Sequence, residues 1–146
     1  MTLVSLLAAV TLALNTAQIE KRLEDVPGLV ATKFQIEEIL EPNPLKVFAR
    51  IKAREAEIDE EKFLELISCE SEWKVNAKGD YRSETGEYMA QGILQFWVET
   101  FIGYNEFYQL GGKWKNPRHQ ITLASWMIRD GEIGHWRNCG KKAGFV

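Results

Sequence analysis

Apolar residues recur at helical spacing soon after residue 44, and polar residues mark where the helices begin. The stretch 45–56 has the apolar periodicity of one amphipathic helix. A second helix is expected directly after Asp59, whose carboxylate can cap it, with Ile58 and Phe63 in contact across the cap. The pattern therefore predicts two successive helices in this part of the chain.

The second helix is expected to bring Glu70 onto its apolar face. Phe63, Leu66 and Ile67 define that face, and Glu70 follows them at i+3 and i+4 spacing. Contact with apolar side chains disfavours the charged form of a carboxyl group and raises its pKa, as a general acid working near neutral pH requires. The spacing is equally compatible with a side chain that turns to solvent because the helix ends there.

The rest of the chain is predicted to contain one irregular segment and two further helices. The stretch 74–87 is rich in Asn, Gly, Asp and Ser, which indicates a loop or a short hairpin. One helix is expected over 94–103 and another over 118–130, the latter begun by Asn116-Pro117 and ended by Gly131. These elements together predict a mainly α fold.

The N-terminal region has a different pattern. The apolar run 3–14 is too short to span a bilayer comfortably but is typical of the hydrophobic region of a secretory signal. No Lys or Arg precedes it, so an uncleaved anchor fits as well. We expect a signal peptide or membrane anchor at 1–18, a lead-in at 19–44 that ends in Pro42-Asn43-Pro44, a functional domain at 45–146, and export of the protein.

Charge and cysteine content narrow the function classes. The net charge of −3 argues against a nucleic-acid partner, which normally requires a basic stripe. Segment 113–146 is nevertheless basic, so it either approaches an anionic surface or forms an ordinary solvated face. The two cysteines, Cys69 and Cys139, are compatible with one disulfide, with two buried thiols, or with a zinc site that adds His119 and His135.

An ordered set of short motifs accompanies Glu70. The set comprises Cys69-Glu70-Ser71, Asn76-Ala77, Gly79-Asp80, Ala90-Gln91-Gly92-Ile93-Leu94-Gln95-Phe96, Thr100-Phe101, Gly111-Gly112, Gln120-Ile121, Gly134-His135-Trp136 and Cys139. In its order and spacing the set resembles the lytic transglycosylase domain of the lysozyme-like superfamily, and especially its compact resuscitation-promoting-factor type. The resemblance covers about residues 45–140 and implies a small, mainly helical α+β lysozyme-like fold with a catalytic cleft.

The resemblance also implies roles for particular residues. Glu70 matches the single catalytic acid. Gly92 and Gln95 match a Gly-x-x-Gln element, in which the small residue lets the chain pass close to the sugar and the amide donates to it. Thr100 and Gln120 match polar groups that line the cleft.

Two further expectations concern the cysteines and the acids near the cleft. In the family type that the chain resembles, a Cys beside the catalytic Glu pairs with a C-terminal Cys, which implies a Cys69–Cys139 disulfide. The interval from Asp80 to Gly92 is longer than in compact relatives and contains Glu87 as well as Glu84. Asp80 and Glu87 are candidate substrate contacts, and Asp80, Glu84 and Glu87 are the candidates for a second acid. A departure is the absence of the Ala-Tyr-Asn motif found near the end of many transglycosylase domains.

The activity that the resemblance implies is cleavage of the MurNAc–GlcNAc β-1,4 bond of peptidoglycan by a monomer without metal or cofactor. Glu70 would protonate the leaving oxygen while the C6 hydroxyl of the muramoyl residue attacks C1, which gives a 1,6-anhydro end. An acid that positions water would instead make the domain a hydrolytic muramidase similar to goose-type lysozymes, and the separation of the carboxylates decides between these outcomes. A non-catalytic glycan-binding module and a purely structural domain are the alternatives from other classes.

Overall fold

The computed structural model describes residues 41–146, of which Leu45–Val146 form one compact unit. The signal or anchor expected at 1–18, and residues 19–40 of the expected lead-in, lie outside the described residues. The described part is mainly helical with a small antiparallel sheet, so the mainly α expectation is confirmed at this level. The described elements, in chain order, are α4 (Pro44–Glu55), α5 (Glu60–Ser71), β1 (Lys78–Arg82), β2 (Glu87–Gln91), β3 (Phe96–Trp97), α6 (Val98–Phe107), α7 (Pro117–Arg129), the 3-10 helix η2 (Glu132–Trp136) and α8 (Arg137–Lys142).

The two helix starts that rest on capping chemistry are confirmed. The Asp59 carboxylate accepts a hydrogen bond from the Lys62 backbone N–H at 3.0 Å and so caps α5. The Asn116 side chain accepts from the first N–H groups of α7, and Pro117 occupies its first turn. Gly131, with φ of 93°, follows α7 in the left-handed conformation that suits glycine and stops the helix.

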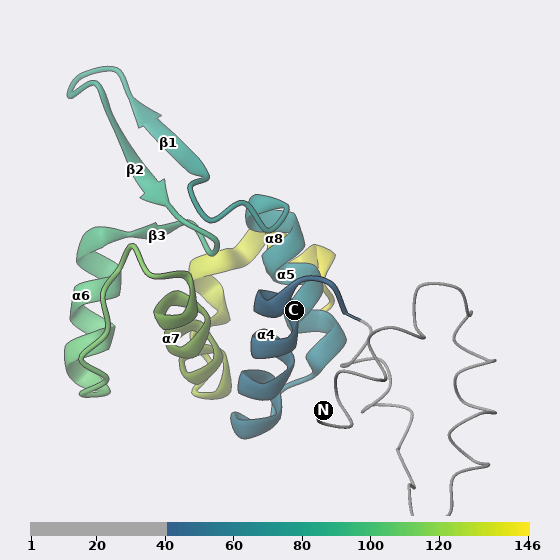
Figure 1. Ribbon diagram of the computed structural model, residues 1–146. Helices are drawn as coiled ribbons and strands as arrows, with labels where there is room; N and C mark the ends of the chain where they lie inside the picture. Colours follow the sequence, from purple (N-terminus) through teal and green to yellow (C-terminus); the bar gives the residue numbers. More distant parts are fainter. Residues whose placement is uncertain (1–40) are drawn as a thin grey trace, which may run out of the picture. The chain divides into compact units, whose positions relative to one another are not determined.

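The segment expected as a loop or short hairpin is a hairpin. Strands β1 and β2 pair antiparallel with Tyr81 opposite Tyr88, and β3 adds a third strand beside β2. Gly86, with φ of 71°, lies in the turn that joins β1 to β2. The hairpin projects away from the helices, as Figure 1 shows.

The helix predicted over 94–103 is wrong in its bounds. The structure begins α6 at Val98 and continues it to Phe107. Gly92 and Gln95 have φ values of 86° and 48°, and this left-handed backbone makes residues 92–95 a turn. The chain then pairs as β3 before the helix starts, so residues assigned to one helix in fact span a turn, a strand and the start of α6.

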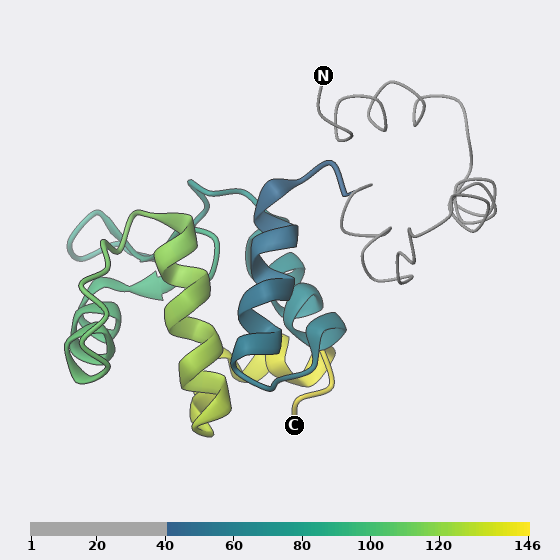
Figure 2. The same cartoon turned by 60° about the horizontal axis from the view of Figure 1, so that its bottom comes forward.

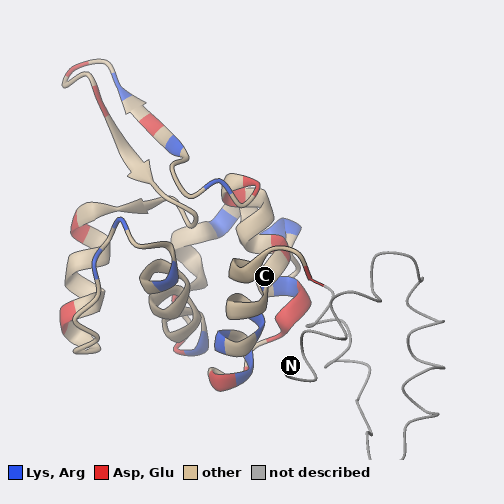
Figure 3. Cartoon of the chain, viewed as in Figure 1, with Lys and Arg blue, Asp and Glu red and all other residues tan. Residues whose placement is uncertain are grey.

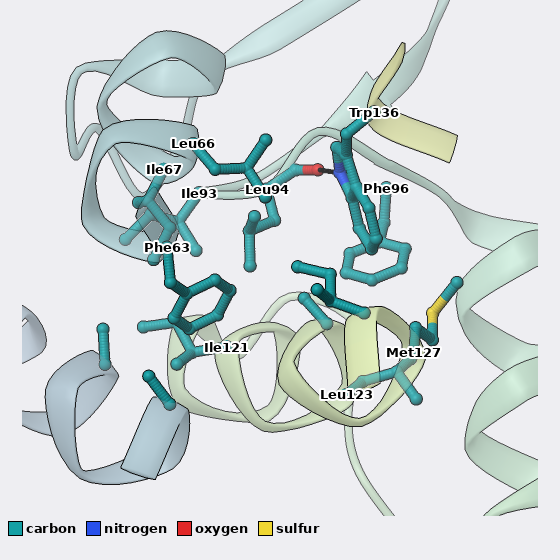
Figure 4. Close-up of a cluster of buried hydrophobic side chains, with 14 of the residues drawn as sticks. Phe63, Leu66, Ile67, Ile93, Leu94, Phe96, Ile121, Leu123, Met127 and Trp136 are labelled. Carbon is teal, nitrogen blue, oxygen red and sulfur yellow. Dashed lines mark hydrogen bonds between the residues drawn. The ribbon is translucent and has the colours of Figure 1, made fainter. Parts of the chain in front are cut away.

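The helices enclose one hydrophobic core. Helix α7 lies between α6 on one side and α4 with α5 on the other, in both Figure 1 and Figure 2. The core takes the apolar faces of α5 and α7 and the turn after β2, and Figure 4 labels its main members: Phe63, Leu66, Ile67, Ile93, Leu94, Phe96, Ile121, Leu123, Met127 and Trp136. Because α8 packs on α5 and η2 packs on α7, the C-terminal segment closes the core beside the turn.

Candidate active site

Glu70 lies in the last turn of α5, one residue before the helix ends. Ser71 is buried, and its hydroxyl donates a 2.7 Å hydrogen bond to the carbonyl of Ile93, which ties this end of α5 to the turn after β2. Glu72 then takes a left-handed conformation, φ 52°, and terminates the helix. The side chain of Glu70 is half-buried rather than turned fully to solvent.

The environment of Glu70 favours its protonated form. The pKa of the Glu70 carboxyl is raised from 4.5 to about 7, mainly by burial and to a lesser extent by the negative charge of Asp80, while the positive charge of Lys142 acts in the opposite direction. A carboxylic acid with this pKa is partly protonated at neutral pH. It can therefore donate a proton and take one back in the same cycle.

A cavity of about 580 Å³ opens beside Glu70. Its wall is made by the end of α5, by the hairpin with β3, by the start of α6, and by the segment from η2 into α8. The lining residues are Glu70, Asp80, Ala90, Gln95, Phe96, Trp97, Thr100, Gly134, His135, Trp136, Arg137 and Asn138. Both carboxylates therefore face one cavity together with aromatic rings, which are surfaces on which sugar rings can stack.

The hairpin positions Asp80 through an unusual backbone conformation. Asp80 has φ of 51°, a left-handed value that Asp tolerates better than most residues. Its carboxylate accepts a 2.9 Å hydrogen bond from the indole N–H of Trp97 on β3. The guanidinium of Arg82 lies over the Trp97 ring, 4.8 Å from the centroid. Backbone strain of this kind collects at functional sites when neighbouring contacts hold it in place.

Gln95 and Gly92 belong to the turn between β2 and β3. The Gln95 amide donates to the Gly92 carbonyl at 2.8 Å, so in this structure its N–H faces the turn, while the side chain still lines the cavity. Gly92 does not line the cavity. A Cβ at Gly92 would lie 2.2 Å from the Gln120 amide nitrogen, so glycine is required here for the packing of Gln120.

Gln120 does not line the cavity but holds the backbone of the turn between β2 and β3, which contributes to the cavity wall. It is only 1% exposed. Its carbonyl oxygen accepts from the Leu94 N–H at 3.0 Å, and its amide donates to the Trp114 and Gln91 carbonyls at 2.6 and 3.2 Å. The buried side chain thus fixes, through these hydrogen bonds, the turn that contains Gln95. The expected position at the surface of the cleft does not hold, because these partners use the whole amide.

The two remaining candidate residues differ in position. Thr100 lines the cavity from the first turn of α6. Glu87 begins β2, is exposed, and pairs across the hairpin with Arg82 in register, away from the lining residues. Among the acids proposed from sequence, Asp80 therefore joins Glu70 in the cavity and Glu87 does not.

The C-terminal wall contains residues that sequence reasoning did not assign to the cleft. His135, Trp136, Arg137 and Asn138 line the cavity from η2 and the start of α8. The Trp136 indole N–H donates to the Leu94 carbonyl at 2.8 Å, the hydrogen bond drawn in Figure 4. The Gly134-His135-Trp136 motif marks the segment, but no helical periodicity in it indicates which side chains face inward.

The disulfide between Cys69 and Cys139 is confirmed and joins α5 to α8, with the two Cα atoms 5.6 Å apart. Zinc binding by these thiols is excluded because both sulfurs are in the disulfide. Within residues 41–146, no group of three or more metal-ligating side chains lies together. None of the helices described there is long and apolar enough to cross a membrane.

A second groove, of about 590 Å³, adjoins the cavity. The two share Thr100 and His135, and the groove continues along α6 past Tyr104, Phe107 and Tyr108. Phe107 is 74% exposed, so the groove presents a large aromatic surface to solvent. An elongated ligand could therefore extend from the cavity onto α6.

Comparisons with protein-family models, with curated proteins and with solved structures found no match to this chain.

Proposed function

We propose that residues 45–146 cleave the β-1,4 bond between MurNAc and GlcNAc in peptidoglycan, with Glu70 as the acid and base of a lytic transglycosylase. The observation that carries the proposal is the Glu70 carboxyl, with its pKa raised to about 7, in a cavity lined by aromatic and polar side chains. A binding module has no need of such an acid. The lysozyme-like fold, export from the cell and action as a monomer form part of the same proposal.

The proposed reaction uses one carboxyl group twice. Protonated Glu70 donates its proton to the glycosidic oxygen, and the C1–O bond breaks with the electron pair leaving on that oxygen. The carboxylate then accepts the proton of the muramoyl C6 hydroxyl, whose oxygen bonds to C1. The products are a 1,6-anhydro end and a free hydroxyl, Glu70 is again protonated, and neither water nor a cofactor is consumed.

Asp80 supports a second candidate, hydrolysis by a muramidase. It faces the same cavity as Glu70, and its negative charge raises the pKa of the acid. Glycosidases that hydrolyse their substrate commonly use such a pair, in which the second carboxylate activates water or acts as nucleophile. The hydrolytic product is a reducing end rather than an anhydro end.

The test compares wild-type protein with Glu70→Gln and Glu65→Gln on purified peptidoglycan, with released muropeptides identified by mass spectrometry. Glu65 lies on the same helix but is exposed, so its variant controls for the loss of one carboxylate from α5. We expect anhydro-muropeptides from the wild type and Glu65→Gln. Release by Glu70→Gln is expected to fall about 100- to 10,000-fold, the range in which general acids contribute.

The products separate the alternatives. Reducing ends that depend on Glu70 would assign the domain as a hydrolase. Binding to peptidoglycan without release by any of the three proteins would leave a glycan-binding module and overturn the enzymatic proposal.

A further inference from the structure

Two arginines, Arg137 in the cavity lining and Arg82 beside it, form no ion pair with a carboxylate within the described residues, although Glu87 lies opposite Arg82 in the hairpin register. Arg137 lines the cavity from the start of α8, and the guanidinium of Arg82 lies 4.8 Å from the ring centroid of Trp97, which lines it from β3. Arg50, Arg54 and Arg129, which do not line the cavity, each pair with a carboxylate, whereas Arg118, also outside the lining, pairs with none in the described part of the chain. Arg137 therefore lines the cavity, and the guanidinium of Arg82 lies beside it, against the ring of Trp97.

The geometry of Arg82 leaves its donors available. The guanidinium lies over the Trp97 ring, and within the described residues its N–H groups form no ion pair with a carboxylate. Trp97 is itself held by its hydrogen bond to Asp80, so Arg82 stacks on an anchored ring. Figure 3 shows basic and acidic positions alternating along β1, where Arg82 follows Asp80.

The charge arrangement indicates what these arginines would bind. Glu70 and Asp80 are the acids that line the cavity, so an anionic group of a ligand would be repelled from them and would be held at the rim by the cations. A guanidinium matches a carboxylate with two parallel hydrogen bonds. A muramoyl residue without a stem carries one carboxylate, that of its lactyl ether, whereas a peptide stem converts this group to an amide and adds several carboxylates farther from the ring.

We propose that Arg82 and Arg137 bind carboxylates of the peptide stem on the muramoyl residue at the cleavage site, and so make the domain select glycan that bears stems. The inference rests on the proposed function, since it names the substrate feature that the same site recognises. The hairpin then serves as a second recognition element beside the sugar-binding cavity.

The experiment measures binding of Glu70→Gln protein, which prevents turnover, to soluble glycan strands of two kinds. One kind retains its peptide stems. The other has been stripped of them with an amidase, and the lactyl carboxylates that the amidase exposes have been converted to amides. Arg82→Gln and Arg137→Gln are each introduced into this protein. The matched control is Arg118→Gln, because Arg118 also stacks on an aromatic ring, Phe48, at 4.8 Å but lies outside the cavity.

We expect each cavity arginine variant to bind stem-bearing strands about tenfold more weakly, the loss expected for one charge-assisted contact. Binding to stripped strands should change less than twofold, and Arg118→Gln should match the parent on both. Equal losses on the two kinds of strand, or no loss on either, would overturn the inference. Arg82→Lys serves as a second variant, since it keeps the charge but removes the planar fork and should recover only part of the affinity.

The same data distinguish this inference from the proposed function. If wild-type protein releases anhydro-muropeptides from peptidoglycan but the arginine variants bind both strands normally, only stem recognition fails. If wild-type protein neither binds nor cleaves either strand, the proposed function fails and the inference fails with it.

Discussion

The two carboxylates of the cavity are carried by walls of different construction. Glu70 lies on α5, whose apolar face is buried and whose end is fixed by the Ser71 hydrogen bond and the Cys69–Cys139 disulfide. Asp80 lies on an exposed hairpin that projects from the helices and is held at this point by the indole of Trp97. Glu70 is thus carried by a helix that packs into the hydrophobic core, whereas Asp80 is carried by an exposed hairpin.

The difference between the two walls suits them to different roles in the cavity. Raising a pKa by burial requires contact with packed side chains that displace water from part of the carboxyl group, and the end of α5 supplies it. Electrostatic support, recognition of substituents and admission of a polymer require a wall near solvent, and a hairpin supplies that. Changes to the α5 wall should therefore alter stability and the acid together, whereas changes to the hairpin should alter activity with little effect on stability.

The largest effect should come from removing the disulfide that fixes the α5 wall. Replacing Cys69 and Cys139 by Ser opens a loop closed over a sequence separation of 70 residues, and the chain-entropy relation predicts a loss of about 4 kcal/mol in unfolding free energy. Urea denaturation measures it, and wild-type protein treated with reductant should match the double variant. A loss below about 1 kcal/mol would show that this wall is fixed by packing alone.

The next effect tests the turn that joins the two walls. Gly92→Ala should destabilise the domain by roughly 2–3 kcal/mol, because the added methyl strains a φ of 86° and meets the Gln120 amide at 2.2 Å. Gly86→Ala is the matched control, since Gly86 has φ of 71° but nothing within 4 Å of its added Cβ. It should lose only about 1 kcal/mol. Equal losses in thermal or urea unfolding would remove the role assigned to Gln120.

A smaller effect concerns the burial of Glu70. Its pKa in the folded protein, about 7, lies above the ordinary value of 4.5, so ionisation opposes folding and this group lowers stability as pH rises from about 4.5 to about 7. Glu70→Gln lacks this dependence. Relative to wild type it should gain about 1–2 kcal/mol between pH 4 and pH 8, after discounting for the exposed part of the side chain. If the unfolding free energies of the two proteins, measured with urea, changed in parallel with pH, burial would not be the cause of the raised pKa of Glu70.

The smallest predicted shift comes from the hairpin wall. Asp80→Asn keeps an acceptor for Trp97 but removes a negative charge that raises the pKa of Glu70. The alkaline limb of the pH–rate profile should move to lower pH, by less than burial moves it, with stability nearly unchanged. Glu87→Gln, a hairpin variant outside the cavity, should leave the profile in place. Loss of activity at every pH in Asp80→Asn would instead assign Asp80 a direct part in the reaction, as in a hydrolase.

Sequence reasoning succeeded where the cause is local. The cap at Asp59 and the stop at Gly131 depend on residues within one turn, and both are confirmed. The Cys69–Cys139 pairing followed only from the resemblance, because spacing alone left thiols and zinc open. Placement of Glu70 beside apolar side chains followed from helical phase, but its half-buried state depends on elements that the sequence pattern did not predict.

The predictions that were wrong or missing all depend on contacts between segments that are distant in the sequence. Residues 94–103 read as one helix because apolar spacing cannot reveal that Gly92 must turn to admit Gln120 from another helix. The inward position of Arg137 depends on η2 and α8, short segments without clear periodicity. A buried amide and an exposed amide look the same in sequence, so Gln120 was assigned to the cleft surface and not to the support beneath it.

The closure of the cavity by η2 and α8 also has a consequence for biosynthesis. Glu70 leaves the ribosome long before residues 134–138, which form the C-terminal wall of the cavity, and before Cys139, the partner of Cys69. A nascent chain made only to residue 133 has its acid but neither a closed cavity nor the cross-link. Because contacts between distant segments form late in folding, the group that would cut the wall polymer gains its perturbed environment only when synthesis of the domain is nearly finished.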